Sequence, residues 1–201
     1  MINEYVDPKR MEARNAPHAK YMTESQMDVT MDMVSIVRRG MLRSGKFSET
    51  LGQLAGTYAL DQNIPKDQAE FILRDQYEAR YGEGMKQTLD NLRERETVLR
   101  EAGTEQELHH ANRVEGHIRD GQTMPCYKAI DVEAVEMSQK QGITENAAKS
   151  MMNDAFEKEN GRSLYEVGKE LEEQYHKPVR DAERAALRAQ RQQRQRTGPQ
   201  M

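Results

Sequence analysis

Apolar side chains recur every three or four residues from about residue 23 to about residue 178, the spacing that places them on one face of an α-helix. The first stripe comprises Met33, Val34, Val37 and Met41. It follows Thr23-Glu24-Ser25-Gln26, which has the spacing of a capping box, so a helix is predicted to begin there. Further stripes, separated by turn residues, predict helices that start near residues 48, 65, 85 and 104. The pattern therefore predicts an all-α fold.

The second half of the chain repeats the first at one constant offset, without a gap. The paired positions include apolar residues and turn residues: Leu51 and Ile130, Ala55 and Ala134, Asn63 and Gly142, Ile64 and Ile143, Ala69 and Ala148, Gly82 and Gly161. Two unrelated amphipathic helices would share apolar spacing for a few turns, but would seldom share both turn residues as well. We interpret residues 51–92 and 130–171 as two copies of one helix-turn-helix unit.

We expect an elongated multi-helix protein with four parts. Residues 1–22 form an N-terminal arm, residues 23–103 and 104–178 form two helical units, and residues 179–201 form a basic tail rich in Arg and Gln. The start of the tail can extend as a helix through Ala185 and Leu187, but the Arg/Gln run has no apolar face and ends in Gly198-Pro199, so this run is expected to be disordered when free.

The composition limits both the core and the cellular setting. Hydrophobic residues make up 36% of the 201 residues and charged residues 32%, with no Trp, so a deep core is not expected. Because Cys126 is the only cysteine, an intramolecular disulfide and a Cys-based zinc site are both excluded. The first thirty residues hold no apolar run long enough for a signal peptide or a membrane span. We expect a soluble, cytoplasmic protein that does not enter a membrane.

The charge is distributed unevenly along the chain. Six arginines and two acids give residues 179–201 a charge of +4, and since the whole chain carries −4, the part from Met1 to Pro178 carries −8. The candidate binding residues for nucleic acid or an acidic partner are these six arginines: Arg180, Arg184, Arg188, Arg191, Arg194 and Arg196. A flexible cationic strip of this kind binds phosphates in a salt-dependent manner. A tail that only aids solubility is the other interpretation.

Three histidines are the strongest candidates for metal chemistry. His110 and His117 are seven residues apart and share a helical face, and Glu107 or Glu115 offers oxygen ligands. However, two-histidine metal helices use a spacing of four, and the adjacent His109 points elsewhere. We therefore expect a solvated histidine-rich surface, no metal and no other cofactor.

The sequence lacks the patterns of common active sites. We find no Ser/His/Asp or Cys/His set, no glycine-rich phosphate loop and no H-E-x-x-H motif, so no catalytic residue is assigned. The duplicated turn resembles that of DNA-binding helix-turn-helix proteins, and the positions that fit are Ser138, Gly142, Ile143, Ala148 and Met151. The helix after this turn carries at least as many acids as bases, which disfavours contact with phosphates.

The segment GITENAAKSMMNDAFEKENGRSLYEVGKELEEQYHKPVRDAERAALRAQRQQRQR resembles the helical C-terminal regions of conjugative-plasmid relaxases and related mobilisation proteins. Those regions also end in Arg/Gln-rich tails. The resemblance covers roughly the last third of the chain and implies protein partners from the relaxosome or the secretion channel. The chain lacks the metal-binding His triad and the nucleophilic Tyr of the catalytic part of that family, so nicking activity is not implied.

The leading hypothesis is a non-catalytic accessory or regulatory protein of a mobile genetic element that acts through protein–protein contacts. In this hypothesis the tail adds affinity for nucleic acid or for a partner. One alternative is a helix-turn-helix transcriptional regulator that reads DNA with the turn at Gly142. Another is a small metal-dependent hydrolase built on the histidines. The oligomeric state is not predicted.

Overall fold

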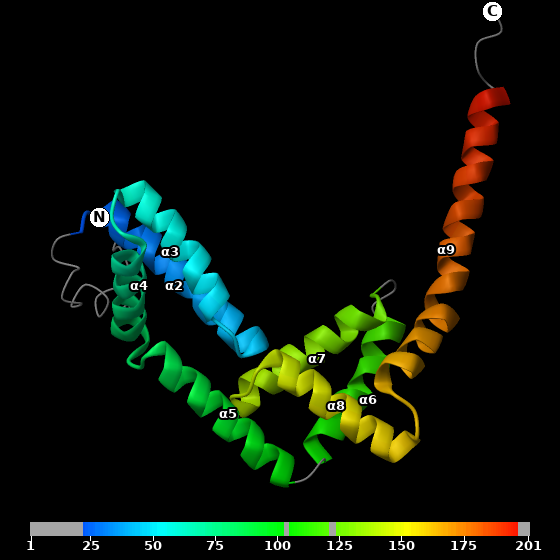
Figure 1. The fold of residues 1–201 in the computed structure, drawn as a ribbon. Helices are drawn as coiled ribbons and strands as arrows, with labels where there is room; N and C mark the ends of the chain where they lie inside the picture. Colours follow the sequence, from blue (N-terminus) through cyan, green and yellow to red (C-terminus); the bar gives the residue numbers. More distant parts are fainter. Residues whose placement is uncertain (1–21, 103–104, 121–123, 197–201) are drawn as a thin grey trace, which may run out of the picture. The chain divides into compact units, whose positions relative to one another are not determined.

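The computed structural model of the chain describes residues 22–102, 105–120 and 124–196, with side chains up to Arg191. These residues form eight α-helices and no strand, which confirms the all-α prediction (Figure 1). The helices are α2 (Glu24–Ser44), α3 (Ser48–Gln62), α4 (Lys66–Tyr81), α5 (Met85–Ala102), α6 (Glu105–Asp120), α7 (Cys126–Gln141), α8 (Glu145–Asn160) and α9 (Leu164–Arg196). The predicted N-terminal arm, apart from Met22, lies outside the described residues.

The chain divides into two compact units. Unit 1 comprises Met1–Ala102 and Gln141–Ala147, and therefore holds α2 to α5. Unit 2 comprises Gly103–Lys140 and Ala148–Met201, and therefore holds α6, α9 and most of α7 and α8.

Helix α2 begins at the predicted capping box. The Gln26 backbone N–H donates to Thr23 Oγ1 at 3.2 Å, and the Thr23 backbone N–H donates to Gln26 Oε1 at 2.8 Å. Each hydrogen bond satisfies a backbone donor that the first helical turn leaves without an intrahelical acceptor. The helix ends at Gly45, whose φ of 67° is the left-handed conformation that glycine adopts without strain.

The core of unit 1 is formed by one apolar face from each of α2 to α5. The predicted stripe of α2 lies in this core. Its buried residues are Met33, Val34, Val37, Met41, Leu51, Ala55, Tyr58, Ala59, Ala69, Leu73, Tyr77, Met85, Leu89 and Leu92. Methionine supplies three of these positions, in line with its expected role of filling gaps between helices.

The predicted duplication is present in the backbone. Helix α4 spans Lys66–Tyr81 and α8 spans Glu145–Asn160, so both of their ends are separated by the same offset that pairs Leu51 with Ile130. The turns between helices use the left-handed conformation at equivalent positions, with φ of 52° at Asn63 and 68° at Gly142, and of 73° at Gly82 and 70° at Gly161. A left-handed residue ends a helix and redirects the chain, so the two copies turn at the same points.

Equivalent apolar positions of the two copies are also buried alike. The buried pairs are Leu51 and Ile130, Ala55 and Ala134, Tyr58 and Met137, Ala59 and Ser138, Ala69 and Ala148, Leu73 and Met152, Tyr77 and Phe156, and Met85 and Leu164. Ile64 is partly buried against the core of unit 1, and Ile143 is buried. The same helix faces therefore point inward in both copies.

The structure extends the repeat to one more helix than the sequence pattern indicated. Helix α6 matches α2 at a slightly shorter offset, and five pairs of buried positions coincide: Thr30 and Glu107, Met33 and His110, Val34 and Ala111, Val37 and Val114, and Met41 and Ile118. The offset grows by two after this helix because the loop after α6 is two residues longer than the loop after α2. A comparison of the two halves of the sequence at a single offset therefore loses the match at this loop. The repeated unit has four helices.

Helix α9 corrects the expectation for the tail. It continues through Pro178 to Arg196, whereas the Arg/Gln run was expected to be disordered. The expectation considered only the missing apolar face. The run consists mainly of Ala, Arg and Gln, which are among the residues that favour helix most, and this propensity agrees with the helix that forms.

The first half of α9 secures the ends of two other helices of unit 2. His176, which is 2% exposed, donates from Nε2 to the Ile118 carbonyl oxygen in the last turn of α6 at 2.8 Å. Glu172 Oε2 accepts from the backbone N–H of Cys126, the first residue of α7, at 3.0 Å. Both contacts satisfy backbone groups that helix ends leave open, and the carboxylate also suits the positive end of the α7 dipole.

Close packing of α9 against α7 predicts a strict size limit at Gly168. A Cβ atom at this position would collide with Cys126 Sγ. We expect Gly168→Ala to lower the free energy of unfolding by ~1–3 kcal/mol, measured by urea denaturation followed by circular dichroism. The matched control is Gly56→Ala in α3, where an added Cβ meets nothing within 4 Å. That change should raise stability by up to ~1 kcal/mol, because alanine favours helix over glycine.

Replacing Cys126 by Ala in the Gly168→Ala chain removes the atom that collides. The double variant should therefore recover most of the lost stability. Equal stability of Gly168→Ala and the unmodified chain would show that the described contact is wrong.

Candidate functional site

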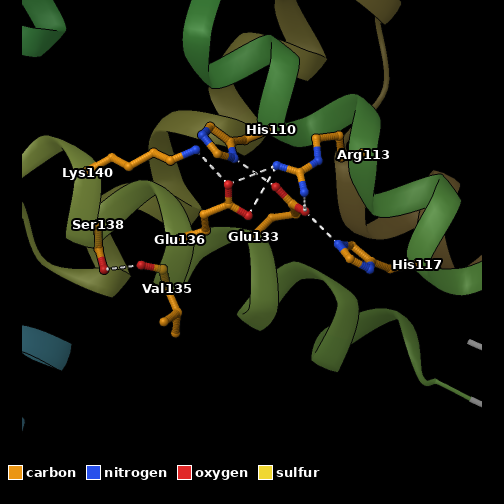
Figure 2. Close-up of polar contacts among 8 residues, drawn as sticks. All are labelled: His110, Arg113, His117, Glu133, Val135, Glu136, Ser138 and Lys140. Atoms are coloured by element: carbon orange, nitrogen blue, oxygen red, sulfur yellow. Dashed lines mark hydrogen bonds and ion pairs between the residues drawn. The ribbon is translucent and has the colours of Figure 1, made fainter.

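The most distinctive polar cluster of the described residues lies between α6 and α7 of unit 2 (Figure 2). Its centre is Glu133, whose side chain is fully buried. One carboxylate oxygen, Oε2, lies 2.7 Å from His110 Nδ1, and the other, Oε1, lies 2.5 Å from His117 Nε2. Arg113 approaches Oε1 at 3.4 Å. A buried carboxylate requires hydrogen-bond partners, and these three α6 side chains supply them.

Both helices present their polar residues with the same spacing. His110, Arg113 and His117 occupy positions i, i+3 and i+7 of α6, and Glu133, Glu136 and Lys140 occupy the same positions of α7. Positions at this spacing lie on one face of a helix. The two faces meet, and each cation or imidazole of α6 reaches a carboxylate of α7 (Figure 2).

Glu136 forms the outer part of the cluster. Arg113 donates from Nη1 to both carboxylate oxygens of Glu136 at 3.1 Å, and Lys140 Nζ donates to Oε1 at 2.6 Å. The hydrogen bonds from Lys140 and Arg113 lower the pKa of Glu136 to about 2. Because the pKa of Glu136 in the folded protein lies below its ordinary value of 4.5, its ionised form stabilises the folded state. This stabilisation is complete above about pH 4.5 and is lost as the pH falls towards 2.

These contacts correct the expectation of a solvated histidine-rich surface. Of the three histidines of α6 only His109 is exposed, whereas His110 is 5% exposed and the His117 side chain is 30% exposed. The predicted extra ligands are also replaced, because Glu133 and Glu136 of α7 approach the histidines instead of Glu107 or Glu115. Ligand atoms of His110, Glu133 and Glu136 all lie within 4.8 Å of one another.

The equivalent residues of unit 1 are almost all apolar or small. His110 corresponds to Met33, Glu133 to Leu54, Arg113 to Ile36, His117 to Gly40 and Glu136 to Thr57. Met33 is buried in the core of unit 1, and Leu54 packs against that core. The repeated fold therefore does not require a charged cluster here. Because a buried ion-pair network is often no more stable than apolar residues of similar size, a gain in stability does not by itself explain the charged cluster of unit 2.

A surface hollow lies beside the cluster. It has a volume of about 610 Å³ and is lined by Asn112, Arg113, Glu115, Gly116, His117, Arg119, Asp120 and Met124. A smaller cavity of about 170 Å³ between α6, α8 and α9 is lined mainly by apolar side chains, including Val114, Phe156, Leu164 and Leu171. The first hollow gives solvent a path to His117 and Arg113 at the edge of the cluster.

The predicted arginine site lies on the C-terminal part of α9. Residues 177–191 are all exposed, and they include Arg180, Arg184, Arg188 and Arg191. Arg180 also pairs with Glu172 at 3.6 Å. Arg194 and Arg196 belong to the same helix but lie beyond the residues whose side chains are described. The histidine cluster belongs to α6 and α7, whereas the six arginines belong to α9, so we treat them as two candidate sites of unit 2.

The helix-turn-helix positions around Gly142 have a packing role in the structure. Ser138, Ile143, Ala148 and Met151 are all buried, between 0% and 7% exposed. Any two helices that meet at a tight turn require buried residues of this kind for packing. Helix α8 also carries more acids than bases, with Glu145, Asp154, Glu157 and Glu159 against two lysines.

Comparisons with models of known protein families, with curated proteins and with solved structures found no match. None of the described helices has both the length and the apolar character that crossing a membrane requires. The geometry of unit 2 and the differences between the two copies are therefore the basis for a functional proposal.

The divergence between the units predicts a particular pattern of stability changes. Glu133→Leu alone leaves the buried His110 without its partner, and His110→Met alone removes one of the contacts to a buried carboxylate. We expect each single change to destabilise the protein by ~1–3 kcal/mol. The double variant, which restores the residue pair of unit 1, should be within ~1 kcal/mol of the unmodified chain or more stable.

Urea denaturation of the four proteins gives the coupling energy directly. Additive losses in the double variant would show that His110 and Glu133 do not depend on each other. His109→Ala is the matched control, because His109 is exposed on the same helix, and it should change stability by less than ~0.5 kcal/mol.

Proposed function

We propose that the protein is a non-catalytic accessory or regulatory protein of a mobile genetic element, which takes part in processing or transfer of plasmid DNA. In this role its helical units contact a protein partner, such as a component of the relaxosome or the secretion channel, and the C-terminal part of α9 binds nucleic acid. The exposed arginine face of α9 is the observation that carries the proposal. The resemblance of this segment to relaxase C-terminal regions supplies the biological setting.

The helix organises the arginines more strictly than a flexible tail would. Arg180, Arg184, Arg188 and Arg191 follow one another at spacings of four, four and three residues, which keeps them on one face. With a rise of 1.5 Å per residue, this row of cations is about 16 Å long. The Cβ atoms of successive arginines are about 5–6 Å apart.

The charge distribution supports binding by this helix alone. The part of the chain from Met1 to Pro178 carries −8 and repels a polyanion, whereas residues 179–201 carry +4. Phosphate contacts fix a protein on nucleic acid without reading its bases, so we expect little sequence preference.

The first test is a salt titration of duplex DNA binding. If all six arginines neutralise phosphates, the slope of log affinity against log salt approaches roughly −5. Replacing Arg184, Arg188 and Arg191 by Gln should make the slope shallower by about 2.7 and weaken binding at low salt. The charge-matched control replaces Arg93, Arg95 and Arg100 of α5 by Gln and should leave the slope unchanged.

If the two triple variants lose the same affinity for DNA, net charge and not the arginine face of α9 governs binding. A chain that ends at Pro178, keeps its affinity and distinguishes DNA sequences would instead favour the helix-turn-helix regulator. The left-handed turn residues Asn63 and Gly142, which are themselves exposed, are the observation behind that second candidate.

Two large apolar side chains of unit 1 are well exposed. Leu60 of α3 is 84% exposed and Phe71 of α4 is 64% exposed. The equivalent residues of the second copy are Gln139 and Ser150, both of which are exposed as well. The repeated fold is therefore compatible with polar residues at both positions, and we take the exposed Leu and Phe of unit 1 as candidate contacts for a partner.

Leu60→Gln combined with Phe71→Ser, which copies unit 2 into unit 1, should leave the stability within ~0.5 kcal/mol and reduce partner binding at least tenfold. The measurement is quantitative co-purification of relaxosome and secretion-channel proteins from a plasmid-carrying host. Val98→Gln, a change of another exposed apolar residue in α5, is the control. Undiminished co-purification with the double variant would exclude this surface.

A further inference from the structure

We propose that His110, His117, Glu133 and Glu136 form a binding site for one divalent transition metal ion such as zinc, in which the ion replaces Arg113 as the counter-charge. The site lies wholly within unit 2, between α6 and α7. It is independent of the nucleic acid and partner binding proposed above.

Three of the four donor residues already lie close together, and the fourth, His117, contacts one of them. Glu133 Oε2 lies 2.7 Å from His110 Nδ1, and Glu133 Oε1 lies 2.5 Å from His117 Nε2. Ligand atoms of His110, Glu133 and Glu136 fall within 4.8 Å of one another. Zinc bonds of about 2.1 Å in a tetrahedral site place ligand atoms about 3.4 Å apart. His110, Glu133 and Glu136 are thus near this spacing, whereas His117 lies at the opposite oxygen of Glu133 and its side chain has to turn to complete the site.

The charges of the site also fit a divalent cation. Two carboxylates face two imidazoles, and the positive charge near them comes from Arg113 and Lys140, whose side chains are 41% and 60% exposed. Both are long side chains at the rim, so they can turn into solvent when an ion takes over their role. The carboxylate of Glu133 is fully buried and keeps a neutralising partner in either arrangement.

The donor set selects the kind of ion. Two nitrogens and two carboxylate oxygens suit zinc, cobalt or nickel, whereas calcium and magnesium prefer oxygen ligands alone. The hollow lined by Arg113 and His117 gives a hydrated ion access to the site. With four protein ligands the ion has no open position, which is typical of a structural site that fastens one helix to another.

The difference between the two copies of the repeat supports the site independently of the distances between its atoms. Unit 1 has Met33, Gly40, Leu54 and Thr57 at the four ligand positions, and the same four-helix arrangement forms there without a histidine or carboxylate among them. The four ligand residues thus occur together at one place of an otherwise shared framework.

The experiment is a titration of the full chain, freed of metal with a chelator, by zinc in a calorimeter and by cobalt in a spectrophotometer. We expect one equivalent of each ion to bind, with a cobalt spectrum typical of tetrahedral nitrogen and oxygen ligation. Glu136→Gln and His117→Ala should each weaken binding at least about tenfold. His109→Ala should bind as tightly as the unmodified chain. Arg113→Gln should bind more tightly, because the competing cation is gone.

Absence of stoichiometric binding, or equal loss in His109→Ala and His117→Ala, would overturn the proposal. Weaker binding in Arg113→Gln would also overturn it, because it would show that the arginine and the carboxylates act as a unit without a metal. Thermal unfolding with and without zinc distinguishes a folding defect from lost ligation. Zinc should raise the unfolding temperature of the unmodified chain and of Arg113→Gln, but not that of Glu136→Gln.

Discussion

The burial of the Glu133 carboxylate is the constraint that organises unit 2. A carboxylate without water is stable only if its oxygens find donors, and those donors come from three side chains of the neighbouring helix. The spacing of His110, Arg113 and His117 on α6 therefore fixes how α6 lies against α7. Helix α9 then completes unit 2, because His176 caps the end of α6 and Glu172 caps the start of α7.

Residues that recur in both copies are required by the fold, whereas residues present in one copy only are not. The fold needs the left-handed turn residues and the buried faces, which recur at equivalent positions of both copies. It does not need the histidine and glutamate cluster, for which unit 1 has Met33 and Leu54, nor the exposed Leu60 and Phe71, for which the second copy has polar residues. The two copies thus differ from each other at two separate sets of positions.

Much of the fold was predictable because it follows from local rules. Helix periodicity, the capping box at Thr23 and the turn residues Asn63 and Gly142 depend only on neighbours in the sequence. The cluster was not predictable in the same way, since Glu133 is far from His110 in the sequence and meets it only after α6 and α7 pack. A sequence signal existed in the shared i, i+3, i+7 spacing of the two helices. The helical Arg/Gln run departs from expectation because helix propensity, and not only an apolar face, determines whether such a segment is helical.

The most direct test of the central claim, that Glu133 holds both imidazoles, is a long-range proton–nitrogen NMR spectrum of the histidine rings. An ionised carboxylate only accepts hydrogen bonds, so we predict that His110 carries its proton on Nδ1 and His117 on Nε2. Each should show a hydrogen-bonded ring proton that disappears in Glu133→Leu. The exposed His109 should show neither feature. Mixed tautomers for His110 and His117, with spectra like that of His109, would contradict the described cluster.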